Sequence, residues 1–141
     1  MIAVDSNVLI AAHRGEHPDH ETALRRLTEF AEGEAPWGLP VFCVAEFVRV
    51  VTHPRVFSPP SALGVACAFV DRLLASPSLR LLLPTDQFWD SLRRVAIDAG
   101  TGGNLIFDAQ IATVCRDAGV RRLLSYDRDF ARFAFLALER P

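Results

Sequence analysis

Short apolar runs alternate with segments of helical periodicity along the whole chain. The strand candidates cover residues 1–4, 37–39, 79–83, 122–125 and 135–138. The helix candidates lie between them, over residues 6–12, 17–32, 40–52, 61–75, 86–99 and 104–118. Strands that alternate with helices are typical of a parallel sheet covered by helices. We therefore predict an α/β fold, with one domain over residues 1–141 and a central parallel β-sheet of four to five strands flanked by helices.

The composition is that of an ordinary globular domain, with 50% hydrophobic and 23% charged residues. No apolar run approaches the roughly 20 residues that a membrane-spanning helix needs. The first residues also lack the basic segment that opens a signal peptide. We expect a cytoplasmic protein without a membrane segment. Cys43, Cys67 and Cys115 are widely spaced among apolar residues, which favours core packing over a disulfide framework or a zinc site.

All 15 basic residues are arginines, and the chain contains no lysine. The formal net charge of −2 argues weakly against a general nucleic-acid binder. Arginine nevertheless binds phosphate through a bidentate fork, which suits RNA. A GC-rich coding sequence would produce the same bias. The missing lysine is therefore more useful for excluding functions than for assigning one.

Four carboxylates stand in surroundings that are too apolar for exposed acids. Each of them either follows an apolar strand or interrupts an apolar helix, and they are Asp5, Glu46, Asp108 and Asp127. Burying an ionised carboxylate without a partner costs several kcal/mol, so each of them needs a compensating charge. Arg49 lies one turn after Glu46 and could pair with it, but no basic residue lies within a turn of Asp108.

A shared divalent cation would compensate all four carboxylates at once. Mg²⁺ binds oxygen ligands and usually takes a few carboxylates together with water and phosphate. The four acids are far apart in sequence, so they can meet only through the fold. Taken singly, each has an ordinary explanation: Asp5 could cap a helix, Glu46 could be paired or snorkelling, and Asp127 could belong to a charged turn. Only the joint pattern favours a metal site.

The order of these acids and their neighbours resembles the PIN domain and, within it, the VapC toxins of type II toxin–antitoxin systems. The resemblance covers nearly the whole chain. It is carried by the segments VDSNVLI (4–10), HPDH (17–20), EFVRV (46–50), NLIFDA (104–109) and LSYDRDF (124–130). The last segment has Ser125 where the family usually has Thr, which retains the hydroxyl.

The resemblance implies an endoribonuclease that cleaves RNA with a metal-activated water. By this likeness Asp5, Glu46 and Asp108 would bind Mg²⁺ or Mn²⁺, and Asp127 would complete the site. The alternative fourth acid is Asp129, but we expect it to cap the following turn. The likeness further implies inhibition by a small VapB-type antitoxin and assembly into a homodimer.

Two further side chains, Asn7 and Ser125, are candidates for orienting the metal ligands. Helix capping after a strand would explain them equally well.

Other functions must be weighed against this interpretation. A Mg²⁺-binding aspartate-cluster phosphotransfer domain, such as a response-regulator receiver or a haloacid-dehalogenase phosphatase, needs a lysine near the phosphate, and this chain has none. The phosphatase also requires D-x-D on its first strand, where this chain has Asp5-Ser6-Asn7. A flap-type nuclease usually needs a longer chain. A catalytically inactive PIN-like protein-binding module is the remaining alternative, and the intact set of acids argues against it.

Overall fold

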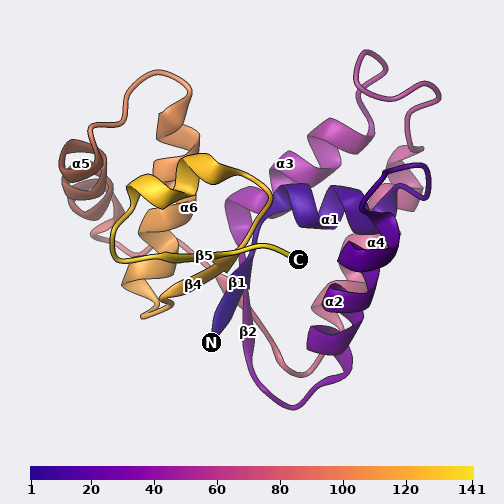
Figure 1. Ribbon diagram of the computed structural model, residues 1–141, viewed down its shortest axis with the longest axis horizontal. Coiled ribbons are helices and arrows are strands. Elements are labelled where there is room, and N and C mark those ends of the chain that lie inside the picture. Colours follow the sequence, from indigo (N-terminus) through magenta and orange to yellow (C-terminus); the bar gives the residue numbers. More distant parts are fainter.

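A five-stranded parallel sheet forms the centre of the computed structural model, which describes residues 1–141 (Figure 1). The strands are β1 (Ile2–Val4), β2 (Trp37–Pro40), β3 (Leu79–Leu82), β4 (Arg122–Leu124) and β5 (Ala137–Glu139). Their order across the sheet is β3-β2-β1-β4-β5, and every neighbouring pair is parallel. The predicted α/β fold with a central parallel sheet is confirmed.

Six α-helices and one 3₁₀ helix connect these strands. They are α1 (Ser6–His13), α2 (His20–Glu32), α3 (Val41–Val51), α4 (Leu63–Leu74), α5 (Phe88–Ala99), α6 (Leu105–Asp117) and the 3₁₀ helix η1 (Arg128–Arg132). Figure 1 shows α1, α2 and α4 toward one side of the view and α5 with α6 toward the other. Helix α1 packs on α2 and α3, and α5 packs on α6. None of these helices has both the length and the apolar character that crossing a membrane would require.

Three helices, α2, α4 and α5, begin later than the sequence predicts. For α2 and α4 the reason is that local side chains make other hydrogen bonds. Helix α2 starts at His20, since the Nδ1 atom of His17 accepts a hydrogen bond from the backbone of Asp19 and holds a turn there. Helix α4 starts at Leu63, and Ser61 does not cap it. The hydroxyl of Ser61 instead accepts a hydrogen bond from Arg14 at 3.0 Å.

Strands β1 and β2 are buried along their whole length, which explains why they are continuously apolar in sequence. Trp37, Phe47 and Phe130 are among the large side chains that are fully buried in the core. Cys43 and Cys115 are buried as expected, but Cys67 is exposed, so its predicted place in the core is wrong. All three cysteines are free thiols, in agreement with the absence of a disulfide framework.

The strand order creates a topological switch point at β1. The chain runs from β1 to β2 and β3 on one side, and returns to β4 and β5 on the other. In open parallel sheets a crevice forms outside the carboxyl ends of the strands at such a point. Asp5 follows β1 and Ser125 follows β4, and the paired strands end together because Val4 is in register with Leu124. The fold therefore brings the polar residues after these two strands to the same crevice.

The packing of α3 can be tested at Phe47, which is 0% exposed and stacks against Phe69 with ring centroids 5.0 Å apart. Phe47→Ala should lower the free energy of unfolding by about 3–5 kcal/mol, because it leaves a cavity in the core. Urea denaturation measures this loss. Leu63→Ala is the control, since Leu63 is 62% exposed, and it should change stability by no more than about 0.5 kcal/mol. Equal stabilities of the two variants would contradict the described packing.

Candidate active site

Asp5 is the most deeply buried of the predicted acids. It lies directly after β1, is 3% exposed, and its backbone N–H donates to the carbonyl of Leu124 at 3.0 Å. Its side chain caps α1, because the N–H of Ser6 donates to Oδ1 at 2.7 Å. The thiol of Cys43 donates to the same oxygen at 3.7 Å. Asp5 therefore does cap a helix, but the cap uses only one carboxylate oxygen.

The other oxygen of Asp5 is held by a network that crosses from β1 to β4. The hydroxyl of Ser125 donates to Oδ2 of Asp5 at 2.6 Å. The amide of Asn7 donates to the Ser125 hydroxyl at 2.9 Å and accepts from the backbone N–H of Tyr126 at 3.2 Å. The N–H of Asp127 also donates to the Ser125 hydroxyl, at 3.0 Å. Asn7 and Ser125 thus connect the start of α1 to the segment that carries Asp127.

Glu46 on α3 reaches the same network through Ser6. The Ser6 hydroxyl donates to Oε2 of Glu46 at 2.8 Å, and its distance to Oδ1 of Asp5 is 3.4 Å. The other oxygen of Glu46 lies 3.5 Å from the guanidinium of Arg49, as the helical spacing predicts. Ser6 therefore holds two carboxylates from different elements close together.

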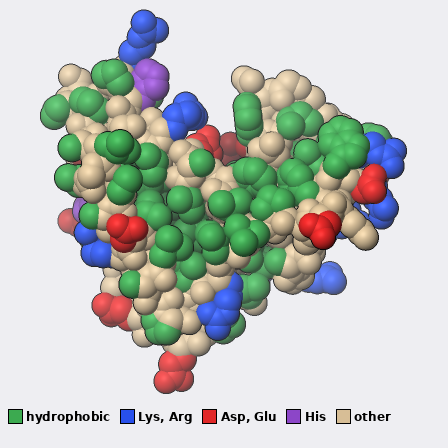
Figure 2. Space-filling view, turned by 180° about the vertical axis from the view of Figure 1, so that it is seen from behind, with side chains coloured by type: hydrophobic (Ala, Val, Ile, Leu, Met, Phe, Trp, Pro, Cys, Tyr) green, Lys and Arg blue, Asp and Glu red, His purple; other side chains and the backbone are tan.

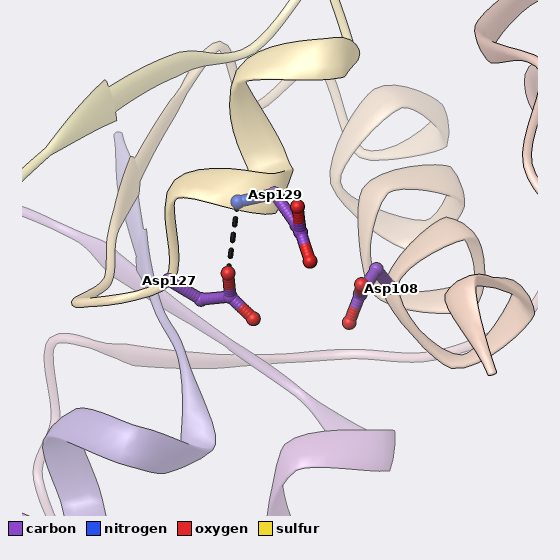
Figure 3. A group of neighbouring side chains, drawn as sticks. All are labelled: Asp108, Asp127 and Asp129. Atoms are coloured by element: carbon purple, nitrogen blue, oxygen red, sulfur yellow. Dashed lines mark hydrogen bonds between the residues drawn. The ribbon is translucent and has the colours of Figure 1, made fainter.

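Asp108, Asp127 and Asp129 form a second, compact group of acids. One oxygen of each lies within 4.8 Å of the others. Figure 3 shows the side chains of Asp127 and Asp129, which flank the start of η1, directed toward Asp108 on α6. Asp129 also contacts Arg132 at 3.2 Å, but this ion pair is largely exposed.

The carboxyl groups at the two ends of this arrangement are hard to ionise. Burial raises the pKa of Asp5 from 3.8 to about 6, and the negative charge of Glu46 adds to the effect. Hydrogen bonds from Ser125 and Ser6 act in the opposite direction, because they stabilise the ionised form.

Asp108 shows the same behaviour for a partly different reason. Loss of hydration, together with the nearby negative charges of Asp127, Asp129 and Glu46, raises its pKa from 3.8 to about 6. Glu46 thus interacts electrostatically with both Asp5 and Asp108. All the predicted acids, together with Asp129, belong to one region of mutual repulsion.

A cleft of about 750 Å³ opens beside these acids. Its polar wall is made by Glu46, Arg49, Asn104, Asp108, Gln110 and Asp129. Figure 2 shows the molecule from behind, with acidic side chains at the base of a notch in its outline. Glu46, Asp108 and Asp129 are therefore reachable from solvent, and a phosphate ester could approach them.

Comparison with known proteins settles the family. The model of the PIN domain matches residues 2–136. The chain belongs to the PIN-domain family.

The relatives of this PIN domain place it among the VapC proteins. Ribonuclease VapC43 of Mycobacterium tuberculosis is 41% identical over 144 residues, which span 100% of this chain and 95% of the relative. Ribonuclease VapC31 of the same organism is 36% identical and covers 100% of this chain and 99% of its own length. The predicted resemblance to VapC ribonucleases is confirmed.

Solved structures share the PIN fold at lower sequence identity. VapC20 of Mycobacterium tuberculosis, a toxin that cleaves the sarcin–ricin loop, superposes with a TM-score of 0.74 at 20% identity, covering 100% of both chains. VapBC2 from Rickettsia felis, solved with a DNA fragment from its promoter, has a TM-score of 0.70 at 19% identity and covers 99% of this chain and 98% of its own.

The site of this PIN domain differs from the sequence prediction at Asp127 and Asp129. The prediction that Asp129 caps the following turn is wrong: Asp127 caps η1, since its Oδ1 accepts from the N–H of Asp129 at 2.8 Å. Asp129 is free of that task and faces Asp108 together with Asp127 (Figure 3). The two acids are therefore not alternatives in the structure.

Sequence reasoning also passed over Ser6 as a residue of this site. Its position between Asp5 and Asn7 was the one available signal, since a residue that opens α1 must lie near the end of β1. Nothing in the sequence indicated that its hydroxyl would reach Glu46, 40 positions away.

The donor set of the PIN domain fits a hard divalent cation. Its oxygens are carboxylates, and the three on Asp108, Asp127 and Asp129 lie within 4.8 Å of one another. An ion with metal–oxygen distances of about 2.1 Å would hold its ligands within roughly 4 Å of each other, so small side-chain movements suffice. Asp5 and Glu46 are outside this closest group and adjoin it through Glu46.

The repulsion among the acids predicts how the stability of the metal-free protein changes with pH. The folded-state pKa of Asp108 is about 6, above its ordinary value of 3.8, so ionisation of Asp108 destabilises the fold. That destabilisation is complete above about pH 6 and disappears as the pH falls toward about 4. In EDTA near neutral pH, Asp108→Asn should be more stable than wild type by about 1 kcal/mol, after allowance for solvent screening.

Thermal and urea unfolding at about pH 7.5 and about pH 4.5 measure this difference, which should shrink at the lower pH. Asp86→Asn is the control, because Asp86 is an exposed acid outside the cleft. A stabilisation by Asp108→Asn that is equal at both pH values would contradict the electrostatic origin.

Proposed function

We propose that this protein is an Mg²⁺- or Mn²⁺-dependent endoribonuclease of the VapC toxin type. The observation that carries the proposal is the convergence of acids from four separate segments at the switch point of the sheet. Asp5, Glu46 and Asp108 come from the end of β1, from α3 and from α6, while Asp127 and Asp129 flank the start of η1. The VapC ribonucleases among its relatives support the same activity.

The acids and the polar residues that contact them would have distinct roles in RNA cleavage. Asp108, Asp127 and Asp129 would hold the cation, and Asp5 with Glu46 would bind it directly or through water. A divalent ion bound there lowers the pKa of a coordinated water and stabilises charge on the scissile phosphate. Ser6 and Ser125 would fix the orientation of the acids, since their hydroxyls donate to oxygens of Glu46 and Asp5, and Asn7 would hold Ser125 in place by donating to its hydroxyl.

Arginines near the acids would contact the RNA backbone. Arg49 lines the cleft, and its side chain is well exposed. Arg132 contacts Asp129 on the adjoining 3₁₀ helix. Arg122 is a weaker candidate, because it pairs with Glu139 on the edge strand β5. A cleft that is open to solvent suits single-stranded or looped RNA better than a rigid duplex.

The proposed function includes two protein partners, an antitoxin and a second copy of the chain. VapBC complexes of toxin with antitoxin are among the solved structures that share the fold, and we propose that a small VapB-type antitoxin inhibits this protein. We also propose a homodimer, because large apolar side chains such as Val56, Val65 and Ile97 are exposed. Figure 2 shows hydrophobic side chains gathered across the centre of one face. An RNA-cleaving toxin of this kind would act in the cytoplasm, where its substrate is.

The alternatives are less well supported. Membership of the PIN family speaks against an aspartate-cluster phosphotransfer domain. A catalytically inactive protein-binding module would have no need of acids that destabilise one another, whereas here the pKa values of Asp5 and Asp108 are both raised to about 6.

Cleavage of RNA should depend on the metal and on the acids. Purified protein incubated with total RNA should cleave it with Mg²⁺ or Mn²⁺ and should lose the activity in EDTA. Asp5→Ala and Asp108→Asn should each lower the cleavage rate by at least ~100-fold, because they remove ligands of the ion that activates water. Gel electrophoresis and sequencing of the fragments measure both effects.

Asp86→Asn should cleave like wild type and is the matched control for changes of charge. Full activity in EDTA, or in both Asp5→Ala and Asp108→Asn, would overturn the metal-nuclease proposal. Intact metal binding without any cleavage would favour the inactive module.

The orienting role of Ser6 can be tested separately from catalysis. Ser6→Ala removes the hydroxyl that joins Glu46 to Asp5 and should weaken Mn²⁺ binding by roughly 10-fold, as expected when a group that orients metal ligands is lost. Ser6→Thr keeps a hydroxyl and should retain most of the affinity. Isothermal titration calorimetry with Mn²⁺ measures both. Ser91→Ala, on α5 and outside the cleft, is the control; the role is disproved by equal affinity of Ser6→Ala and wild type.

A further inference from the structure

One wall of the cleft beside the acids is apolar. It is made by Phe42, Ala45, Leu105, Phe107 and Ile111. Phe107 directly precedes Asp108, and it is 62% exposed. An aromatic ring that is left largely in water next to a carboxylate cluster contributes little to the core and is available to a ligand.

Helix α6 presents this ring and the acid to the same cleft. Asn104, Phe107, Asp108 and Ile111 follow the i, i+3, i+4, i+7 spacing of one helical face, and all four line the cleft. A ligand that contacts Asp108 in this cleft therefore lies next to Phe107. The aromatic wall and the acid belong to one cleft and are not separate surfaces.

Two carboxamides lie at the border of the apolar wall. The side chain of Asn104 makes no capping hydrogen bond at the start of α6, although it occupies the cap position. Gln110 lines the same cleft and lies three residues after Phe107. A carboxamide both donates and accepts hydrogen bonds, which suits the edge of a nucleobase.

The charges around the wall favour RNA over a protein segment as the occupant. Glu46, Arg49, Asp108 and Asp129 line the same cleft as the apolar wall. An apolar protein segment seated on the wall would bury these charges, and only some of them are paired. A nucleotide avoids that loss, because Arg49 and the cation of the proposed function would face its phosphate while its base lies on the apolar side. The cleft volume of about 750 Å³ lies within the range that small ligands occupy.

We propose that this cleft is a nucleobase subsite, in which an unpaired base of the RNA substrate stacks on Phe107 while Asn104 and Gln110 contact its edge. The inference rests on the proposed ribonuclease function and adds the requirement that the substrate be unpaired next to the cleaved phosphate. Stacking on an aromatic side chain accepts any base, so the carboxamides supply what base preference the subsite has.

The test compares Phe107→Ala with Phe107→Tyr and with Trp89→Ala. The tyrosine variant keeps the aromatic face, and Trp89 is a control aromatic on α5 that is 68% exposed and does not line the cleft. The probe is a fluorescein-labelled, unstructured RNA oligonucleotide of mixed sequence. Its Kd is measured by anisotropy with Ca²⁺ in place of Mg²⁺, and KM and kcat are measured with Mg²⁺.

Phe107→Ala should raise Kd and KM by roughly 5- to 100-fold, the usual effect of losing a base–aromatic stack. Its kcat should change by less than about 3-fold, because the stacking contact stabilises the bound substrate and the transition state equally. Phe107→Tyr and Trp89→Ala should bind the RNA like wild type. Thermal melting checks that all three variants fold.

Unchanged Kd and KM in Phe107→Ala, with metal-dependent cleavage by wild type intact, would overturn the subsite and leave the proposed function standing. Absence of cleavage by wild type under every metal condition would instead overturn the proposed function. Analytical ultracentrifugation of the same variants measures their oligomeric state and so tests the competing occupant of the wall, a second copy of the chain. If Phe107→Ala dissociates a dimer and keeps its RNA affinity, the wall is a contact between copies of the chain and the subsite is wrong.

Discussion

The hydrogen bond from the Ser125 hydroxyl to the buried carboxylate of Asp5 is the interaction on which the site depends. It joins the ends of β1 and β4, the two strands that flank the crevice at the switch point. Without it one oxygen of a carboxylate that is only 3% exposed would lack a partner. The same hydroxyl accepts from Asn7 and from the backbone of Asp127, so one serine sets the relative position of three segments.

The acids of the site destabilise the metal-free fold. Burial and mutual repulsion raise the pKa values of Asp5 and Asp108 to about 6, so near neutral pH both carry charge that the fold disfavours. A cation bound beside these acids would relieve the repulsion between their charges, so metal binding would stabilise the fold. The well-packed core beneath, with Phe47 and Phe130 fully buried, offsets the unfavourable term.

Secondary structure could be predicted from the sequence because its signals are local. The period of apolar residues identified every strand and helix of the sheet layers, and Gly33 and Gly119 lie where α2 and α6 come to their ends. The misplaced starts of α2 and α4 arose where a polar side chain had a distant or unusual partner. Ser61 is the clearest case, since serine is a residue type that often caps helices, and here its hydroxyl instead accepts from Arg14, which is 47 positions away.

The sequence by itself determined the family, the strand and helix pattern, and the acids that stand in apolar surroundings. Hydrophobic periodicity and short motifs are properties of neighbouring residues, so they can be recognised from the sequence alone. Only the tertiary structure decided that Asp127 caps η1, that Asp129 faces Asp108, and that Ser6 joins Glu46 to Asp5. Those contacts depend on which segments meet outside the sheet. A hydrogen bond of about 3 Å between residues far apart along the chain depends on their positions and orientations in space, and the sequence spacing does not reveal these.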